Sequence, residues 1–306
     1  MKNNLKSIIV VGIIVLLAGF INATQMQTSA FAKGAKTIEN VPYASVSPSQ
    51  VMDIYLPEGD GPFPVVVLIH GGAFKMGDKR METRNAEALV AKGYAAASIN
   101  YRLSGEAKYP AQIEDCKAAV RFLRANAAIY HLNPDKIGSW GASAGGNLSA
   151  MLGTSSGIAE LEGKELGNAG FSSSVLASVD WFGPINFLTM DEEAQELGFT
   201  IRTNSESSPE SQLIGKAIQS APDLVKKANP TTYVTPDDAA FFIQAGSMDR
   251  NIPYTQSRNF YDALRKVLGE EKVTFELLEG AGHGGPQFSS PSNLEKVILF
   301  FDKYLK

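Results

Sequence analysis

Short apolar runs alternate with amphipathic segments along most of the chain. Residues 65–69 are an unbroken run of branched apolar side chains that ends at a histidine and two glycines, which predicts a buried central strand. Similar runs predict strands at residues 94–99, 136–140, 177–182, 240–245 and 273–278. Helical spacing, or a run of small helix-compatible residues, predicts helices at residues 81–92, 111–127, 144–152, 253–268 and 293–304. This alternation predicts an α/β fold with a mostly parallel, twisted sheet and helices on both faces.

One long polar segment interrupts the alternation. Residues 187–228 carry acidic and serine-rich stretches and lie between two predicted strands. An insertion at this point is expected near the carboxyl ends of the strands, where a cap or lid over a site would lie. A solvated surface excursion is the alternative. No repeat or long linker divides the chain, so we expect residues 33–306 to form a single domain with a small cap insertion.

The first 32 residues have the pattern of a secretory signal peptide. Lys2 and Lys6 precede an apolar run from residue 8 to residue 21, and a small-x-small pattern follows at residues 30–32. A membrane-spanning helix needs about 20 apolar residues, which is more than this run contains. We therefore expect cleavage after Ala32 and a secreted, periplasmic or extracellular product without stable membrane insertion. An uncleaved N-terminal membrane anchor is the alternative.

Composition and charge narrow the classes of function. The chain has 306 residues, of which 44% are hydrophobic and 20% charged, as in ordinary globular proteins. Lys and Arg number 28 against 32 Asp and Glu, and this net charge of -4 without a basic run argues against nucleic-acid binding. The single cysteine, Cys116, excludes an intramolecular disulfide and is expected to be a small buried apolar residue. With only 3 histidines besides, we expect no metal and no other cofactor.

The pattern G-x-S-x-G occurs twice, in different settings. At residues 141–145 it is centred on Ser143, follows a predicted strand and opens a predicted helix. At residues 153–157 it is centred on Ser155 and lies in a predicted loop. A sharp strand-to-helix turn projects a serine hydroxyl above the sheet, and the free N–H groups of the helix start favour negative charge on a substrate oxygen. Ser143 is therefore the predicted nucleophile, and Ser155 is not.

The loop after residues 65–69 has the chemistry of an oxyanion hole, a set of donors that stabilises negative charge on a substrate oxygen. Its small residues let backbone N–H groups approach a substrate carbonyl. We predict the N–H groups of Gly72, Ala73 and Ala144 as the donors. His70 precedes the nucleophile and lies on this loop, so we expect it to be structural.

A serine nucleophile needs a general base, and His283 is the candidate. It lies in a glycine-rich loop after the last predicted strand, and imidazole accepts and returns protons near neutral pH. His131 lies in a helix-to-strand connection on the opposite side of the sheet and is expected at the surface. Asp249 follows another predicted strand and is the predicted acid that orients the base, with Asp180 as its rival. The order Ser143, Asp249, His283 is the α/β-hydrolase order.

These motifs together resemble those of bacterial secreted α/β-hydrolase esterases. The resemblance covers nearly all of residues 33–306 and extends to the hormone-sensitive-lipase-like enzymes and, more closely, to the BD-FAE-like group that includes acetylxylan and feruloyl esterases. It rests on the Asp249 and His283 loops and on residues 70–72, 100–103, 141–147, 180–184 and 208–211. The resemblance implies an α/β-hydrolase fold and carboxylic-ester hydrolysis without a cofactor, and secretion would suit esters linked to polysaccharides.

The resulting hypothesis is a serine carboxylesterase that forms an acyl-enzyme intermediate. Its expected substrates are short acyl esters or polysaccharide-linked esters, such as acetyl and feruloyl groups. A serine peptidase of the same fold, a lipase for longer acyl chains and a non-catalytic binding module are the alternatives. The sequence leaves the acyl length, the alcohol and the oligomeric state open.

Overall fold

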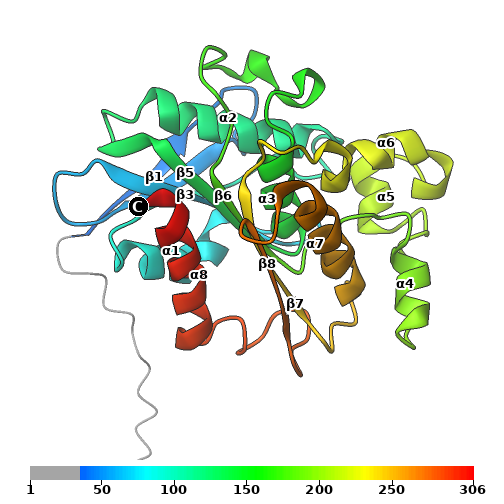
Figure 1. The fold of residues 1–306 in the computed structure, drawn as a ribbon. Helices are drawn as coiled ribbons and strands as arrows, with labels where there is room; N and C mark the ends of the chain where they lie inside the picture. Colours follow the sequence, from blue (N-terminus) through cyan, green and yellow to red (C-terminus); the bar gives the residue numbers. More distant parts are fainter. Residues whose placement is uncertain (1–34) are drawn as a thin grey trace, which may run out of the picture. The chain divides into compact units, whose positions relative to one another are not determined.

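The structure is a computed structural model that describes residues 35–306, and the expected signal peptide at residues 1–32 lies outside this range (Figure 1). Its single 8-stranded sheet has the strand order β1-β2-β4-β3-β5-β6-β7-β8. The strands are β1 (Lys36–Pro42), β2 (Val51–Leu56), β3 (Phe63–Ile69), β4 (Ala95–Ile99), β5 (Leu132–Ala142), β6 (Ala177–Trp181), β7 (Ala240–Gly246) and β8 (Val273–Leu278).

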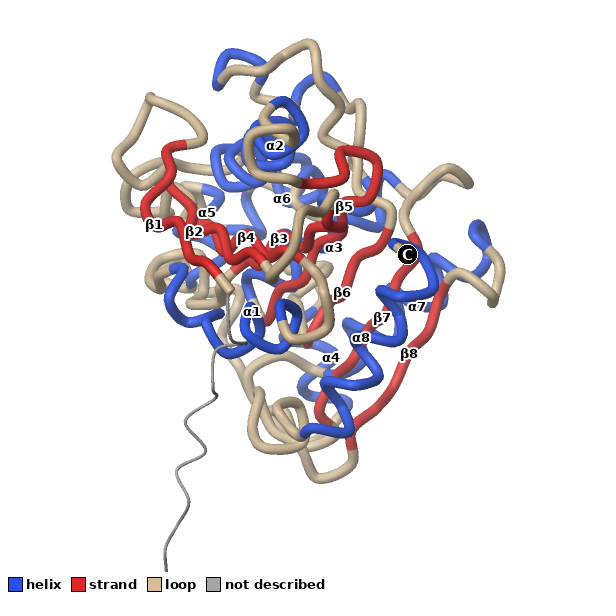
Figure 2. The backbone as a smooth tube through the Cα atoms, turned by 90° about the vertical axis from the view of Figure 1, so that its left-hand side faces the viewer, coloured by secondary structure: helices blue, strands red, loops and turns tan. Residues whose placement is uncertain are grey.

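Helices cover both faces of this sheet (Figure 2). The longer ones are α1 (Thr83–Val90), α2 (Ala111–Ala125), α3 (Ala144–Thr154), α7 (Tyr254–Leu268) and α8 (Pro291–Leu305). The shorter ones are α4 (Met190–Glu196), α5 (Pro209–Ile214), α6 (Pro222–Lys227) and the 3-10 turns η1 (Lys79–Glu82), η2 (Ala159–Leu161), η3 (Lys164–Leu166), η4 (Ile218–Ser220) and η5 (Pro230–Tyr233). The buried clusters place α1 and α8 on one face and α2, α3 and α7 on the other.

The sheet is mostly parallel, which confirms the predicted fold class. Strands β4, β3, β5, β6, β7 and β8 pair in parallel, whereas β2 pairs antiparallel with both β1 and β4. The carboxyl ends of the parallel strands therefore lie along one edge. In open α/β sheets, this edge is where ligands bind.

The sequence analysis named no strand before residue 65 and so missed β1 and β2. Strand β1 is mostly exposed and lacks a clear apolar repeat. In β2, Asp53 interrupts the apolar pattern but is nevertheless buried, because its carboxylate pairs with the Lys79 ammonium at 2.7 Å. A charged residue within a short apolar run usually indicates an exposed position. Here the position is buried because Lys79, which is distant in the sequence, pairs with the charge.

The central strands alternate their side chains between two apolar cores. On β3, Val65, Val67 and Ile69 face the cluster beneath α2, α3 and α7, whereas Val66 and Leu68 face the cluster beneath α1 and α8. Such burial on both faces explains why this strand appears in the sequence as a continuous apolar run. The run that predicted the strand is therefore a direct consequence of the layered architecture.

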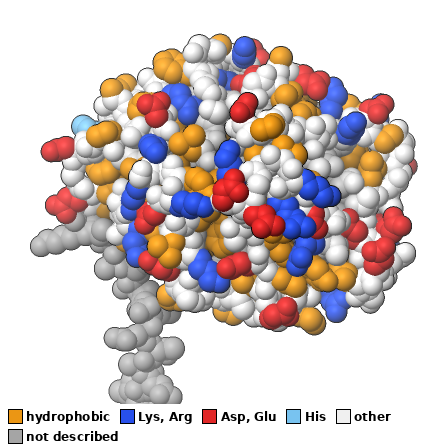
Figure 3. Space-filling view, in the orientation of Figure 1, with side chains coloured by type: hydrophobic (Ala, Val, Ile, Leu, Met, Phe, Trp, Pro, Cys, Tyr) orange, Lys and Arg blue, Asp and Glu red, His pale blue; other side chains and the backbone are white. Residues whose placement is uncertain are grey.

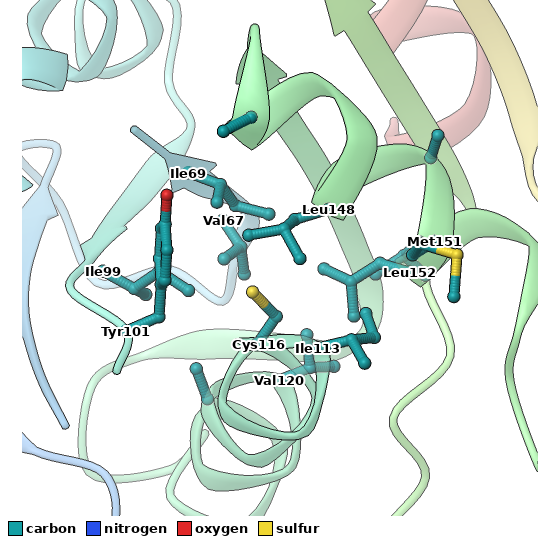
Figure 4. Packing of buried hydrophobic residues seen from close by; sticks show 14 of the residues in the cluster. Val67, Ile69, Ile99, Tyr101, Ile113, Cys116, Val120, Leu148, Met151 and Leu152 are labelled. Carbon is teal, nitrogen blue, oxygen red and sulfur yellow. The ribbon is translucent and has the colours of Figure 1, made fainter. Parts of the chain in front are cut away.

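Cys116 lies in the larger of these cores, as the sequence predicted. Figure 4 shows its sulfur on α2 among the side chains of Ile113, Val67 and Leu148. The thiol is free and fully buried, and burial raises its pKa well above the ordinary value. A thiol in this state packs as a small apolar side chain and is not a nucleophile.

The polar segment at residues 187–228 folds into the short helices α4, α5 and α6, which lie beyond α3 and α7 on the right of Figure 1. Over residues 35–306, no helix has the length and apolar character needed to cross a membrane. Acidic and basic side chains are intermixed over the face drawn in Figure 3, which carries no extended basic patch.

Helix α3 approaches the sheet so closely that two positions require glycine. A Cβ atom on Gly145 would lie 2.0 Å from the carbonyl oxygen of Ile69, at the end of β3. A Cβ atom on Gly141 would lie 2.1 Å from the carbonyl oxygen of Gly145. Both contacts are with backbone atoms, which cannot rotate away as a side chain can. The glycines of the sequence motif therefore set the distance between helix and strand.

Replacing Gly145 by Ala should destabilise the fold, because a methyl group would be forced against the Ile69 carbonyl. Overpacking of this kind lowers the free energy of unfolding by about 1–3 kcal/mol or more. The matched control is Gly105→Ala, since a Cβ atom there meets open space. Urea unfolding of both variants measures the difference, and equal stability of the two would contradict the close approach.

Candidate active site

Ser143 occupies the sharp turn between β5 and α3. Its backbone has φ 57° and ψ -122°, a combination that L-residues rarely adopt. The Ser143 N–H donates to the carbonyl oxygen of Trp181 on β6 at 2.8 Å, and its own carbonyl accepts from Asn147 at 3.1 Å. These bonds hold the strained residue between strand and helix. The turn thus has the geometry of a nucleophile elbow, with the hydroxyl at the carboxyl edge of the sheet, and the role of Ser143 as the nucleophile stays a prediction.

The structure brings Ser143, His283 and Asp249 together. His283 Nε2 lies 2.9 Å from Ser143 Oγ, and His283 Nδ1 lies 2.8 Å from Asp249 Oδ2. The three residues follow β5, β8 and β7, so the parallel sheet delivers all of them to one edge. With Nδ1–H donating to the carboxylate, Nε2 can accept the proton of the serine hydroxyl.

The carboxylate of Asp249 is fixed by its own loop. Its Oδ1 atom accepts the backbone N–H groups of Asn251 at 2.8 Å and Ile252 at 3.0 Å, which leaves Oδ2 for the histidine. The Asp249 side chain is 1% exposed, whereas that of His283 is 22% exposed. The Asp249 carboxylate is therefore held in the interior, whereas the His283 ring is open to the cleft.

The predicted oxyanion loop is tightly folded beside the nucleophile. Gly72 has φ 114°, and a Cβ atom there would lie 2.0 Å from the carbonyl oxygen of Met76. Ala73 has φ 54° and lines the cleft together with Ala144. As the first residue of α3, Ala144 has no helical partner for its N–H group. This arrangement suits the predicted donors Gly72, Ala73 and Ala144, whose role stays a prediction.

His70 and Asp180 have structural partners of their own. The His70 ring stacks on Tyr101 with centroids 4.5 Å apart, and its Nδ1 lies 2.7 Å from the carbonyl oxygen of Gly71. Burial lowers the pKa of His70 and so favours the neutral ring. Asp180 Oδ1 accepts the N–H of Gly183 at 2.9 Å, which closes the turn after β6. The carboxylate that contacts His283 is that of Asp249 and not that of Asp180, and the roles of Asp249 as the acid and His283 as the base stay predictions.

The remaining candidates lie away from this cluster. Ser155 is buried at the end of α3, where its hydroxyl donates to the carbonyl of Met151. His131 directly precedes β5 and is exposed, at the opposite end of that strand from the nucleophile. In residues 35–306, no three His, Cys, Asp or Glu side chains are grouped so that they could hold a metal ion.

A cleft of about 330 Å³ opens over Ser143 and His283. The insertion at residues 187–228 forms much of its wall, so this segment lies where the sequence analysis expected a cap. The lining combines apolar and polar groups, namely Ala73, Phe74, Ala144, Pro184, Met190, Ile201, Arg202, Thr203, Ser208, Pro209, Glu210, Arg250, Asn251 and Ile252. Sequence reasoning gave no role to Glu210 or to the two arginines. The only hint was that residues 208–211 carried part of the family resemblance.

Replacing Asp180 by Asn should make the stability of the fold less sensitive to a rise of pH from about 4 to about 7. Burial raises the pKa of Asp180 from 3.8 to about 7, so the folded state holds the proton more tightly than the unfolded chain. The resulting stability is complete below pH 4 and is lost as pH rises through about 7, whereas an amide does not ionise. The difference obtained by subtracting the Tm of the unsubstituted protein from the Tm of Asp180→Asn should therefore increase from pH 5 to pH 8.

Asp60→Asn is the matched control, because Asp60 is exposed and its replacement shows how Tm changes when one carboxylate is removed from the surface. Thermal unfolding at a series of pH values provides the measurement. A Tm difference for Asp180→Asn that does not change with pH would show that the buried carboxyl carries no such linkage.

Comparison with known proteins identifies the family. The BD-FAE family model matches residues 52–264. Esterase LipC and Esterase LipQ of Mycobacterium tuberculosis are each 30% identical to the chain, over 78% and 81% of its length. The chain spans only 57% of the length of each of these two relatives.

Solved structures agree with this assignment. One titled as a truncated form of a carbohydrate esterase from gut microbiota has 35% identity and a TM-score of 0.81, and the match covers 88% of this chain and 95% of that one. A bifunctional GH43-CE protein of Bacteroides eggerthii has 37% identity and a TM-score of 0.79, but only 35% of its length is matched. The chain therefore belongs to the BD-FAE family and has the α/β-hydrolase fold of the esterases that it resembles.

Proposed function

We propose that this protein is a serine carboxylesterase that removes short acyl groups from sugars or polysaccharides. The observation that carries the proposal is the chain of contacts from Ser143 through His283 to Asp249, at 2.9 and 2.8 Å. The match to a carbohydrate esterase over 95% of that chain supports the substrate class. Export of the chain by residues 1–32 is part of the same proposal, since polysaccharide substrates lie outside the cell.

The first half of the reaction transfers the acyl group to the enzyme. Ser143 Oγ attacks the ester carbonyl carbon while His283 Nε2 takes the hydroxyl proton. The carbonyl oxygen becomes negative and accepts hydrogen bonds from the predicted backbone donors of residues 72, 73 and 144. The bond from carbon to the alcohol oxygen then breaks, and His283 gives its proton to the leaving alcohol. An acyl-Ser143 ester remains.

The second half regenerates the enzyme with water. His283 takes a proton from a water molecule, whose oxygen attacks the acyl carbon. The tetrahedral intermediate breaks down as His283 returns the proton to Ser143 Oγ, and a carboxylic acid leaves. Throughout, Asp249 holds the Nδ1–H of the imidazole and stabilises its positive charge.

The lipase and peptidase alternatives are less well supported by the structure. The cleft volume of about 330 Å³ lies at the low end of the usual range of small-molecule sites, about 300–1,000 Å³, so a long acyl chain is a poor fit. Peptidases of this fold are expected to carry a further domain that selects peptides by size. In residues 35–306, the longest segment outside the alternation of strands and long helices is the insertion at residues 187–228, which consists of short helices.

Replacing Ser143 by Ala should abolish hydrolysis of p-nitrophenyl acetate, because it removes the hydroxyl that lies 2.9 Å from His283 Nε2. Loss of a catalytic serine lowers kcat by up to about 10⁶-fold, which leaves only background turnover. Ser155→Ala is the matched control, since it alters the second G-x-S-x-G pattern and should keep nearly full activity. Retained activity in Ser143→Ala would require a different nucleophile.

The acyl-length preference should follow the size of the cleft. We expect kcat/KM for p-nitrophenyl esters to be highest for acetate to butyrate and to fall steeply for palmitate. Steady-state kinetics with this series provide the measurement, at substrate concentrations below micelle formation. A preference for palmitate over acetate would favour the lipase alternative.

A further inference from the structure

A buried glutamate lines the cleft that contains Ser143 and His283. Glu210 is the second residue of α5, and it lines the same cleft as Ser143 and His283. Only 8% of its surface is exposed. Carboxylates are rarely buried to this extent unless they are paired. The proposed mechanism gives this group no role.

No basic side chain of residues 35–306 forms an ion pair with Glu210. Its carboxyl group accepts from the Ser208 hydroxyl and from its own backbone N–H, but none of the ion pairs in the described part of the chain includes it. Burial raises the pKa of Glu210, and the nearby negative charge of Asp191 raises it further. A group buried in this way lowers stability unless further hydrogen bonds compensate.

Glu210 is also not needed to begin its own helix. The Ser208 side chain caps α5 by accepting the N–H of Ser211 at 3.0 Å, and Pro209 occupies the first helical position. Ser211 Oγ in turn donates to the carbonyl of Ser205 at 2.8 Å. Ser208 and Pro209 thus begin the helix, and Glu210 lines the cleft from its first turn.

The same wall carries hydrogen-bond donors. Arg202, Thr203, Arg250 and Asn251 also line the cleft. The backbone at Thr203 is fixed because its N–H donates to Asp191 Oδ1 at 2.7 Å. The guanidinium of Arg250 lies over the Phe199 ring, 4.8 Å from its centroid. With two arginines and one glutamate among its lining residues, the cleft does not select for a cationic ligand.

We propose that Glu210 determines specificity by accepting hydrogen bonds from the hydroxyl groups of the sugar that bears the ester. A sugar hydroxyl both donates and accepts, so a neutral polyol matches a wall that offers an acceptor at Glu210 and donors at Arg202 and Arg250. Each sugar hydroxyl bonded to Glu210 adds to the hydrogen bonds that its carboxyl group accepts from Ser208 and from its own backbone N–H. This inference rests on the proposed esterase function and assigns a residue to its sugar preference.

The test compares a sugar ester with an ester that has no sugar. Glu210→Gln keeps the shape of the side chain but replaces one acceptor oxygen by a donor. We expect kcat/KM for a mono-O-acetylated methyl β-xyloside to fall on the order of tenfold or more, mainly through KM. Hydrolysis of p-nitrophenyl acetate should stay within about twofold, because that substrate has no hydroxyl groups to bind.

Glu206→Gln is the matched control, since Glu206 lies on the same segment but is exposed, and it should change neither substrate. Thermal unfolding checks that each variant is folded. An equal loss with both substrates, or no loss with the sugar ester, would overturn the role of Glu210. If the unsubstituted protein hydrolyses p-nitrophenyl acetate but not the sugar ester, the role of Glu210 is also overturned. The esterase function is then retained. Failure with both substrates would refute the esterase function itself.

A second measurement needs no variant. Xylotriose carries the hydroxyl groups without an ester, so it should inhibit the hydrolysis of p-nitrophenyl acetate competitively at millimolar concentrations. The Glu210→Gln protein, where folded, should be inhibited less. Absence of inhibition in the unsubstituted protein would contradict a sugar-binding wall.

Discussion

The direct contact of helix α3 with neighbouring backbone fixes the positions of most groups around Ser143. Besides its contact with the end of β3, the helix touches the turn after β6, where a Cβ atom on Gly183 would lie 2.5 Å from the Asn147 nitrogen. The Asn147 side chain then donates to the carbonyl oxygens of Pro184 at 2.8 Å and Ala228 at 3.2 Å. The helix that carries the nucleophile thus also positions the turn after β6 and the end of the insertion. Close packing makes these positions interdependent, since interiors tolerate little displacement.

The insertion has its own anchor on helix α7. Gln256 accepts the backbone N–H groups of Ile185 and Asn186 at 2.9 and 2.7 Å, and it donates to Glu193 of α4 at 2.8 Å. Ser143, Asp249 and His283 therefore lie at the edge of the sheet, whereas the part of the cleft wall formed by residues 187–228 lies on a separately anchored segment. Substitutions in the wall can alter substrate preference while the geometry of Ser143 and His283 is kept.

The sequence predicted the central sheet and the three clustered residues because local signals carry both. Buried parallel strands produce apolar runs, and a serine flanked by glycines between a strand and a helix has few other uses. Strand β1 escaped notice because it is mostly exposed, and β2 because burial of Asp53 depends on Lys79, 26 residues away. Glu210 was missed for a similar reason. Apart from the family resemblance of residues 208–211, its neighbourhood along the chain does not reveal that this glutamate, among the acidic residues of the insertion, is buried in the wall of the cleft.

The distribution of the cluster along the chain bears on when activity can arise. His283 lies 140 residues after Ser143 and 34 residues after Asp249. The nucleophile and its helix are synthesised well before the strands that carry the acid and the base. A growing chain that has completed β6 therefore has an elbow serine with no imidazole to deprotonate it. Under the proposed mechanism, hydrolysis begins only when β7 and β8 have joined the sheet, so a nascent polypeptide would be inactive until its fold is nearly finished. For an enzyme proposed to leave the cell, this delay would protect esters of the cytoplasm during synthesis.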